Sequence, residues 1–557
     1  MDDHMTLQIL DLLETMQVAC QELYTAAELS KTTLFQQITG DMGLGLQTIL
    51  SLVQDKETVG NRRLIPMLQS ILDTVHRVQG HYFRDREYCL KKIEFELLPL
   101  LQEAYGVYYF FQYVADHPEK LPEYFAADKN RLFANAYIDE AIETGKYKYE
   151  LSIGVLAYNK LEYTKQCVES LLKNIPEGLN YELILINHGS NDGTKEFFES
   201  IHPHKQLDIA VNGGGLGAIT RIQEGEFTLE ISNDTIITPH AIANLLACIR
   251  SDEKIGWVVP TTPNISNFQT IPAQYHTPEE LLAFTQRNNC LDPYRWEQRV
   301  RLCNPITMSR NSIICATSGL CTYGWFHSQN PVHCTSFPDD RSSLLLRRNG
   351  YKLMLAKDAY CHHFGSVTLK DEIEQQNEQK YYLEGRQEFY RAFQIDPWGP
   401  GFCYDRVFME RVVKNETGHV EILGLNCGLG SNPLKVKEQI KEYCHNTDCT
   451  MTNLTDDARY LEDLRGISDE AAVITSIKSL KNILYQRAFR YMVLELPFLK
   501  KYKFSTLIKL CLERLAPGGR LFVKASEQLR EAAFRYFPER KELGDDWIVL
   551  ENQDSAS

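Results

Sequence analysis

The sequence lacks the long apolar runs that mark membrane proteins. A membrane-spanning helix needs about 20 predominantly apolar residues, and no window of the 557 residues provides them. The first residues, MDDHMTLQILDLLETMQ, are acidic and lack the basic segment with which a secretory signal opens. We therefore expect a cytoplasmic protein that neither spans a membrane nor carries a secretory signal.

The sequence also lacks an excess of basic residues and any CxxC pair. It contains 59 Lys and Arg against 74 Asp and Glu, which gives a formal net charge of -15. Nucleic-acid-binding proteins usually present a basic surface, so we expect no nucleic-acid partner. The 15 cysteines are scattered along the chain, which is typical of reduced thiols in a cytosolic protein.

The composition, 43% hydrophobic and 24% charged, is that of a folded protein, and the length suggests about three domains. Residues 1–147 repeat apolar residues at spacings of three and four, as in LQILDLLETMQVACQEL, which predicts an α-helical bundle without a catalytic motif. Its aromatic run, Tyr108–Tyr113, fits a helix–helix seam. The alternative is an exposed surface for an acceptor protein or for a second copy, through which the chain would form a homo-oligomer.

Residues 148–397 have the pattern of a parallel α/β domain. The apolar runs YELSIGVLAYN and YELILIN predict strands, with a helical stretch between them. In parallel sheets, ligands bind beyond the carboxyl ends of the strands. The candidate nucleotide-binding residues lie after the predicted strands or in the glycine-rich segment NGGGLG: Ala157, Tyr158, Asn159, Asn187, Gly189, Asp192, Asn212, Gly214, Asn233 and Asp234.

These residue types suit a nucleotide diphosphate. Polar side chains can hydrogen-bond a base and a ribose, and the glycines of NGGGLG let the backbone approach a ligand closely because glycine has no Cβ. Asp234 follows the predicted strand FTLEIS. A carboxylate in this place is a natural ligand for Mg²⁺ or Mn²⁺ bridging a diphosphate. The domain is therefore predicted to bind a nucleotide with a divalent cation.

Four segments of this domain, in this order along the chain, resemble the family 2 glycosyltransferases, which have a GT-A fold. The segments are SIGVLAYNKLEYTKQCVESLL, YELILINHGSNDGT, ISNDTIITPHAI and FPDDRSSLLLRRNGYKLMLAKDAYCHHFGSVT. The resemblance covers about residues 150–395. It implies a fold that binds a nucleotide-sugar donor, for which we expect a UDP-linked sugar.

The resemblance also implies a role for several side chains. Tyr158 and Asn159 would flank the nucleobase and the ribose, and Asp192 would lie close to the nucleotide. Asn187 stands where the family usually has an Asp that hydrogen-bonds uracil. Because an Asn can both donate and accept, the preferred base stays open.

The metal site is implied by two further segments. Ser232–Asp234 falls on the Asp-x-Asp motif of the family, and only Asp234 retains a carboxylate there. His362, with His363 as the alternative, would complete a site for Mn²⁺ or Mg²⁺. When such a cation is bound, it offsets the charge that develops on the departing nucleoside diphosphate.

Asp339 and Asp340 fall on the acidic pair whose carboxylate deprotonates the acceptor, and both remain candidates because the motif fits in either register. Arg341 stands where a further acidic residue is common. The acceptor hydroxyl has a pKa far above 7, so a carboxylate base must lie within hydrogen-bond reach of it. Direct in-line attack would invert the anomeric centre.

Residues 415–552 resemble the class I S-adenosylmethionine-dependent methyltransferase fold in the segments VEILGLNCGLGSNPLKVKE and LAPGGRLFVKA. The resemblance places Gly424 at the position of the first family acid and Asn426 at the first glycine. The strand CTMTNLT offers Asn453, and no carboxylate, at the position of the second acid. We therefore expect a Rossmann-like scaffold that does not bind S-adenosylmethionine. The alternative is that Asn426 and Asn453 still hold the cofactor.

The whole chain is thus predicted to be an inverting, metal-dependent glycosyltransferase in a bacterial cytosol. Its acceptor would be a hydroxyl group, such as a Ser or Thr of a surface protein like flagellin. A polysaccharide or glycan acceptor is the main alternative within this class. A bifunctional glycosyl- and methyltransferase is another. A non-catalytic assembly protein is the alternative from a different class, and the replacements Asn187, Ser232 and Arg341 favour it.

Overall fold

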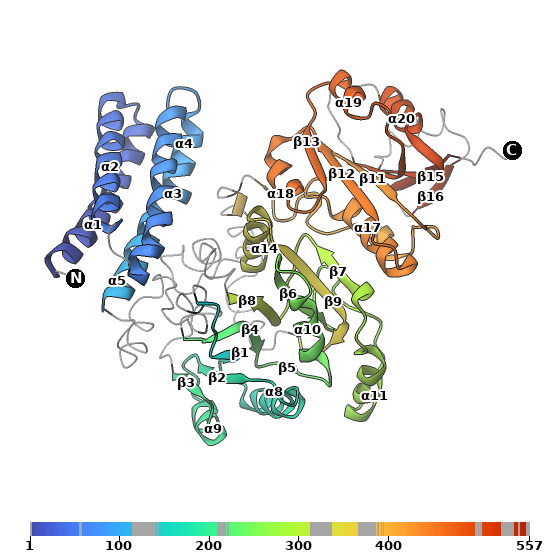
Figure 1. Cartoon of the computed structure of the whole chain (residues 1–557), viewed down its shortest axis with the longest axis horizontal. Helices are drawn as coiled ribbons and strands as arrows, with labels where there is room; N and C mark the ends of the chain where they lie inside the picture. Colours follow the sequence, from blue (N-terminus) through green and yellow to red (C-terminus); the bar gives the residue numbers. More distant parts are fainter. Residues whose placement is uncertain are drawn as a thin grey trace. The chain divides into compact units, whose positions relative to one another are not determined.

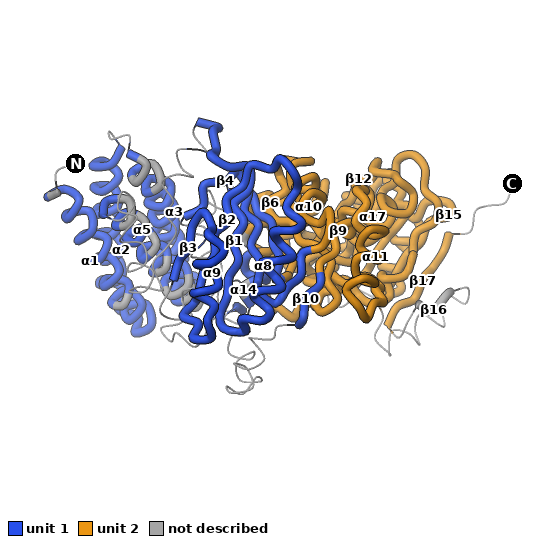
Figure 2. The backbone as a smooth tube through the Cα atoms, turned by 90° about the horizontal axis from the view of Figure 1, so that it is seen from below, with its two compact units in different colours: residues 1–237, 305–342, 362–394 blue, residues 238–304, 343–361, 395–557 orange. Residues whose placement is uncertain are grey.

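The structure is a computed structural model. It describes residues 3–54, 58–113, 141, 144–208, 219, 222–311, 337–365, 386, 389–390, 393, 395–495, 504–524, 540–543 and 546–552. The chain divides into two compact units (Figure 2). One unit comprises residues 1–237, 305–342 and 362–394, and the other comprises residues 238–304, 343–361 and 395–557. Among the described helices, none has the length and the apolar character needed to cross a lipid bilayer.

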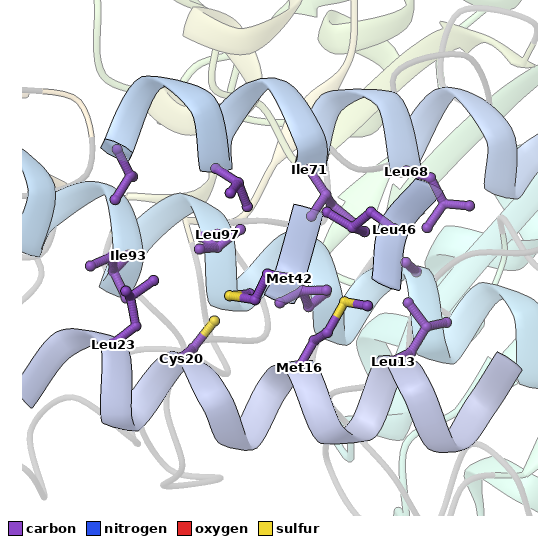
Figure 3. Close-up of a cluster of buried hydrophobic side chains, with 14 of the residues drawn as sticks. Leu13, Met16, Cys20, Leu23, Met42, Leu46, Leu68, Ile71, Ile93 and Leu97 are labelled. Carbon is purple, nitrogen blue, oxygen red and sulfur yellow. The ribbon is translucent and has the colours of Figure 1, made fainter. Parts of the chain in front are cut away.

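The first unit begins with a set of helices that share one apolar core (Figure 3). The helices are α1 (Asp3–Glu28), α2 (Thr32–Val53), α3 (Val59–His81), α4 (Arg86–Lys92), the π-helical turn η1 (Ile93–Leu97) and α5 (Leu98–Tyr113). Leu13 and Met16 of α1 belong to the same buried cluster as Met42 and Leu46 of α2. These positions recur at the helical spacing of three and four that the sequence shows.

The aromatic run at the end of α5 contributes to this core. Tyr108 is fully buried, and Tyr109 and Tyr113 are half-buried side chains packed against the cluster. Burial raises the pKa of the Tyr108 hydroxyl to about 12. For these three tyrosines, the helix–helix seam is therefore the better description. The side chains of Phe110 and Phe111 lie outside the described part of the chain.

The first unit also contains a sheet with the strand order β3-β2-β1-β4-β8 (Figure 1). Its strands are β1 (Tyr149–Ala157), β2 (Tyr181–Asn187), β3 (Lys205–Asp208), β4 (Gly225–Ser232) and β8 (Ile306–Arg310). All pairings are parallel except that of β4 with β8. Helix α8 (Leu161–Asn174) connects β1 to β2, and α9 (Thr194–Ile201) connects β2 to β3. Residues 151–155 of β1 are all buried, which is typical of a parallel strand covered on both faces.

Two short strands and the beginning of a helix complete the part of this unit that contains the candidate site. Strand β5 (Thr235–Ile236) follows β4 directly and pairs antiparallel with β10 (His362–His363). Helix α14 (Pro338–Arg348) begins in this unit, and its first turn contains the two adjacent aspartates. Strand β4 and the elements around it therefore collect segments that are far apart in the sequence.

In the second unit, strands β6 (Ile255–Thr261), β9 (Lys352–Tyr360) and β7 (Trp296–Arg299) are neighbours in that order. The pairing of β6 with β9 is parallel, and that of β7 with β9 is antiparallel. Helix α10 (Ala241–Arg250) packs on β6 and β9, and α11 (Pro278–Asn288) and the turn η4 (Pro293–Arg295) precede β7.

The second unit continues into a seven-stranded sheet with the order β13-β12-β11-β14-β15-β17-β16. The strands are β11 (Val420–Leu425), β12 (Cys449–Thr455), β13 (Glu470–Val473), β14 (Phe489–Leu494), β15 (Leu515–Lys524), β16 (Arg540–Leu543) and β17 (Trp547–Glu551). The helices and turns are η6 (Arg406–Met409), α17 (Ser431–Cys444), η7 (Ala458–Tyr460), α18 (Leu461–Arg465), α19 (Ile477–Ile483) and α20 (Phe504–Leu512). Strands β11 to β15 run parallel, and β17 runs antiparallel between β15 and β16. The order reverses between β11 and β14, which is the ligand-binding point of doubly wound sheets.

Candidate functional site

The carboxyl ends of β1, β2 and β4 lie level with one another in the first unit. In the parallel pairings, Ala157 is opposite Asn187 and Leu156 is opposite Ser232. The backbone N–H of Asn233 continues the β1–β4 contact by donating to the carbonyl of Leu156 at 3.2 Å. The polar turns that follow these three strands therefore meet at the edge where parallel sheets bind ligands.

Asn159 joins the three turns. Its backbone N–H donates to Ser190 Oγ at 2.8 Å, its Oδ1 accepts from the N–H of Asn191 at 3.0 Å, and its carbonyl accepts from Asn233 Nδ2 at 3.0 Å. Its φ of +54° lies in the left-handed region, which Asn adopts more readily than most residues. Asn159 therefore holds the turns after β1, β2 and β4 together.

The side chains of the turn after β2 bind groups within the protein. Asn187 Nδ2 donates to Asp208 Oδ1 at 3.0 Å, and its Oδ1 accepts from the N–H of Ser190 at 2.9 Å. Asp192 accepts from the N–H of Leu161 at 2.8 Å and from the hydroxyl of Thr194 at 2.6 Å, at the beginnings of α8 and α9. Carboxylates are stabilised at helix N-termini. Both side chains thus shape the turn in which they lie.

The remaining candidate nucleotide-sugar-binding residues differ in how they are placed. Ala157 is the buried last residue of β1, and Tyr158 follows it half-buried. Gly189 has a φ of +77°, which a residue with a side chain rarely adopts. Asn212 and Gly214 lie outside the described residues.

The pairing of β5 with β10 brings Asp234 and His363 together. His363 is opposite Thr235 in this pairing, and the N–H of Phe364 donates to the carbonyl of Asp234 at 3.0 Å. His363 Nε2 lies 3.3 Å from Asp234 Oδ2, and both side chains are buried. An imidazole and a carboxylate at this distance can bind one divalent cation in common.

The adjacent His362, the first choice for the metal ligand on the family resemblance, contacts a different side chain. Successive side chains of a strand alternate between its two faces, so His362 and His363 cannot both face Asp234. The ring of His362 instead contacts the ring of Phe364, with 4.6 Å between the centroids. Burial lowers the pKa of His362, and the neighbouring His363 lowers it further. His363 is therefore the histidine whose contact with Asp234 the structure shows.

Two protein ligands are compatible with a cation that binds a nucleotide. Among the described residues, no three or more His, Cys, Asp or Glu side chains form a group that could hold a metal ion. Mg²⁺ and similar ions usually keep several waters and are bound by one or two side chains together with phosphate oxygens. Asp234 and His363 therefore fit a cation whose remaining ligands come from a diphosphate and from water.

The two aspartates lie in the first turn of α14, immediately after Pro338. A proline at the start of a helix and carboxylates in its first turn are both favourable, because the first N–H groups are unpaired and the dipole is positive there. Asp340 is buried, whereas Asp339 is half-buried. The Asp339 carboxylate lies close enough to β4 to raise the pKa of Glu230. The beginning of α14 therefore lies near β4, the strand that Asp234 follows in the sequence.

Glu230 itself was not among the residues predicted from the sequence. The residue as a whole is half-buried, but its Oε2 atom is buried and has no hydrogen-bond partner in the described part of the chain. Burial raises the pKa of this carboxyl well above its usual value, and Asp339 raises it further. The available signal was a carboxylate between the apolar residues Leu229 and Ile231 of this strand.

Comparisons with known proteins match part of the chain. Residues 152–296 match the profile of the family described as Glycosyl transferase family 2. No curated protein matches the chain. Solved structures with a similar fold include GalNAc-T7 with UDP, GalNAc and Mn²⁺ at 13% identity and a TM-score of 0.31, a match that covers 45% of this chain and 52% of that one.

Two further solved structures are similar at the same level. The mannosyltransferase PcManGT from Pyrobaculum calidifontis, in complex with GDP-Man and Mn²⁺, is 12% identical over 58% of this chain and 74% of its own, with a TM-score of 0.29. TarS 1-349 from S. aureus is 16% identical over 44% of this chain and 73% of its own, also with a TM-score of 0.29. The present chain thus spans about half the length of the GalNAc-T7 chain. The similarity to the family described as Glycosyl transferase family 2 thus covers residues 152–296 of the chain.

Proposed function

We propose that the protein transfers a sugar from a nucleotide-sugar donor to a hydroxyl group, with inversion at the anomeric carbon and with the help of a divalent cation. The observation that carries this proposal is the buried pair of Asp234 and His363, 3.3 Å apart at the end of β4. The acidic first turn of α14 is close to the same strand, since its Asp339 carboxylate raises the pKa of Glu230 on β4. A cation ligand and a carboxylate base are the two groups that such a transfer requires.

Asp234 Oδ2 and His363 Nε2 would hold Mn²⁺ or Mg²⁺. The bound cation would supply positive charge against the leaving nucleoside diphosphate. The turns that Asn159 joins by hydrogen bonds would bind the nucleoside, and Tyr158 would lie next to the nucleoside. Because both polar groups of the Asn187 side chain are engaged inside the protein, we assign it to positioning this turn. For the donor we retain a UDP-linked sugar, on the strength of the family resemblance.

Asp339 and Asp340 are the candidates for the base that accepts the proton of the acceptor hydroxyl. Their place in the first turn of α14 favours the ionised form, because the helix dipole stabilises negative charge there. Glu230 also favours the ionised form of the aspartates. Burial and the Asp339 carboxylate both raise the pKa of Glu230, which disfavours a second negative charge beside Asp339. The aspartates can therefore remain anionic, as a base must.

The acceptor that we propose is a Ser or Thr hydroxyl of a protein, such as flagellin in a bacterial cytosol. The support is the architecture of the chain, because the helices of residues 3–113 and the seven-stranded sheet give it surfaces well beyond those of a transfer site. A glycan hydroxyl is the competing acceptor of the same class. The chemistry at the donor is the same for both.

The test is a screen of nucleotide sugars by thermal shift and by donor hydrolysis, with and without Mn²⁺. Ligands that bind the folded state raise its melting temperature. We expect one donor to stabilise the protein only when Mn²⁺ is present and to be hydrolysed slowly. Asp234→Asn should abolish both effects, while Asp41→Asn, an exposed residue of α2, should change neither. No turnover with any donor, and no loss in Asp339→Ala or Asp340→Ala, would favour the non-catalytic assembly protein.

A further inference from the structure

The seven-stranded sheet of the second unit has its own carboxyl edge, at the ends of β11, β14 and β15. The turn Asn426–Gly430 follows β11, Glu495 follows β14, and Lys524 ends β15. Trp547 begins the antiparallel β17 opposite Lys524. In a doubly wound sheet, this edge is where a nucleotide or an adenosyl cofactor would lie. A segment of the chain itself, residues 395–416, occupies it, and we call this segment the strap.

The first contact of the strap is with the glycine turn. The N–H of Leu429 donates to the carbonyl of Pro400 at 3.2 Å, and the hydroxyl of Ser431 donates to the carbonyl of Gly401. A Cβ atom on Gly428 would come within 2.0 Å of the Pro400 oxygen, and one on Gly401 within 2.3 Å of the Leu429 nitrogen. The two backbones are thus in direct contact, with no space for a ligand between them at this point.

The second contact covers the ends of β14 and β15. The carboxylate of Asp405 accepts from Lys524 Nζ at 2.8 Å and from Trp547 Nε1 at 3.0 Å. The N–H of Asp405 donates to Asn432 Oδ1 at 2.8 Å, and Asn432 Nδ2 donates to Glu495 Oε1 at 2.8 Å. The strap therefore supplies the anion that the polar groups of this edge bind.

The third contact runs along α17. Gln439 Nε2 donates to the carbonyls of Phe408 and Glu410 at 2.8 and 2.7 Å, and its Oε1 accepts from the N–H of Val412 at 2.8 Å. Gln439 is fully buried, and Asn432 is almost fully buried. Buried polar side chains need hydrogen-bond partners. On this helix the partners are backbone groups of the strap, which explains why α17 buries amides on that face.

The positions at which the resemblance to methyltransferases expects carboxylates are also filled. A Cβ atom on Gly424 would come within 1.9 Å of Asn453 Oδ1, so no acidic side chain fits there without rearrangement. Asn453 Nδ2 donates to Ser468 Oγ at 2.8 Å. We propose that the strap is the resident occupant of this edge, so that the C-terminal sheet binds its own chain in place of S-adenosylmethionine or a nucleotide.

Helix α17, which binds the strap, also contacts the first two residues of strand β7. Lys435 of α17 lies on Glu297 of β7, with 2.6 Å between Nζ and Oε2, and Lys441 of α17 donates to the carbonyl of Trp296. Both members of the Lys435–Glu297 pair are buried. Since α17 binds the strap through its amides and β7 through its lysines, release of the strap would loosen both attachments. The function of the edge is therefore structural.

Two measurements on the full chain test this proposal. Calorimetric titration with S-adenosylmethionine and with S-adenosylhomocysteine should show no binding up to millimolar concentration. Gly428→Ala and its control Gly418→Ala should then differ. Both glycines have a positive φ, +55° and +76°, but a Cβ on Gly418 meets nothing within 4 Å. The difference between them isolates the contact with Pro400.

The readout for the variants is cleavage by trypsin at Arg406 and Arg411, which are exposed residues of the strap. We expect Gly428→Ala to be cleaved there about tenfold faster than Gly418→Ala, because proteolysis follows the population of the open form. If Gly428→Ala does not fold, Asp405→Asn replaces it and should also be cleaved faster than the wild-type chain. Micromolar binding of either adenosyl compound to the wild-type chain, or equal cleavage of variant and control, would overturn the proposal.

Discussion

The carboxyl edges of two parallel sheets in this protein bear different kinds of side chain, although both follow apolar strands and both contain Asn- and Gly-rich turns. The edge formed by β1, β2 and β4 is followed by the carboxylate–imidazole pair of Asp234 and His363, and Asp339 of α14 raises the pKa of Glu230 on β4. The edge formed by β11, β14 and β15 presents amides, a lysine and an indole, which bind the strap. Similar turns therefore serve different purposes, and the segments that pack against them decide which.

Each edge also buries a carboxyl group beside an aspartate. Glu230 lies on β4 near Asp339, and Glu495 follows β14 near Asp405. Burial raises the pKa of both glutamates, to about 7 for Glu495. At the first edge the aspartate belongs to the proposed transfer site, and at the second it is bound by Lys524 and Trp547. Four experiments can break or sharpen this comparison, and they are given in order of decreasing expected effect.

The largest effect is expected from the proposed base. One of Asp339→Asn and Asp340→Asn should lower the rate of sugar transfer by about 10²–10⁴-fold, because the amide cannot accept the acceptor proton. The other of these two variants should lower the transfer rate much less. Initial rates with saturating donor and Mn²⁺ measure both, and Asp41→Asn serves as the surface control. Equal and small losses in both variants would contradict the assignment of the base to α14.

The next effect separates the two histidines. His363→Gln should weaken the apparent affinity for Mn²⁺ by about 10–100-fold, which is typical of a lost metal-site contact. His362→Gln should leave it nearly unchanged, because that ring contacts Phe364 and not Asp234. The measurement is a Mn²⁺ titration of donor hydrolysis. The opposite ranking would mean that β10 and β5 pair in another register.

The third experiment concerns stability at the second edge. The pKa of Glu495 is about 7 in the folded chain, against an ordinary value of 4.5. The stability tied to its proton is therefore full below about pH 4.5 and is lost as the pH rises to about 7, by on the order of 3 kcal/mol. Glu495→Gln should flatten this dependence in urea unfolding measured from pH 4.5 to 8. An unchanged pH profile would show that Glu495 is ionised when folded.

The smallest effect is expected at Glu230. Burial and the Asp339 carboxylate raise the pKa of its carboxyl and so favour the neutral form, which Glu230→Gln imitates in shape and charge. Sugar transfer near pH 7 should stay within about threefold of the wild-type rate, and stability should fall less as the pH rises. A loss as large as that of the base variants would instead identify Glu230 as an ionised participant in the reaction.

The sequence predicted several strands of both sheets because their signals are local. The apolar runs YELSIGVLA and YELILIN form β1 and β2, and the turn GSNDGT follows β2 as expected. Turn residues act over a few neighbouring positions, so a short window contains the information. Asp234 at the end of β4 and the acidic first turn of α14 could be located in this way. Their placement beside one strand could not, because more than 100 residues separate them.

The choice between His362 and His363 shows what a sequence pattern cannot determine, namely which of two adjacent side chains faces Asp234. Both residues belong to the same two-residue strand, and a shift of one position in the pairing exchanges the faces that they occupy. The same holds for Glu230, whose pKa is raised by burial and by the Asp339 carboxylate, both of which depend on the folded chain. It also holds for residues 395–416, which only their packing on α17 identifies as the strap.

Local chemistry thus determined, from the sequence alone, where strands end, which turns carry carboxylates and amides, and which family the middle of the chain resembles. Tertiary structure decided which of these groups meet. Strand pairing selected His363 for Asp234, and the strap occupied the second sheet edge. The physical reason is range: propensity and turn geometry act between near neighbours, whereas burial, charge pairing and ligand sites arise from residues that only the folded chain brings together.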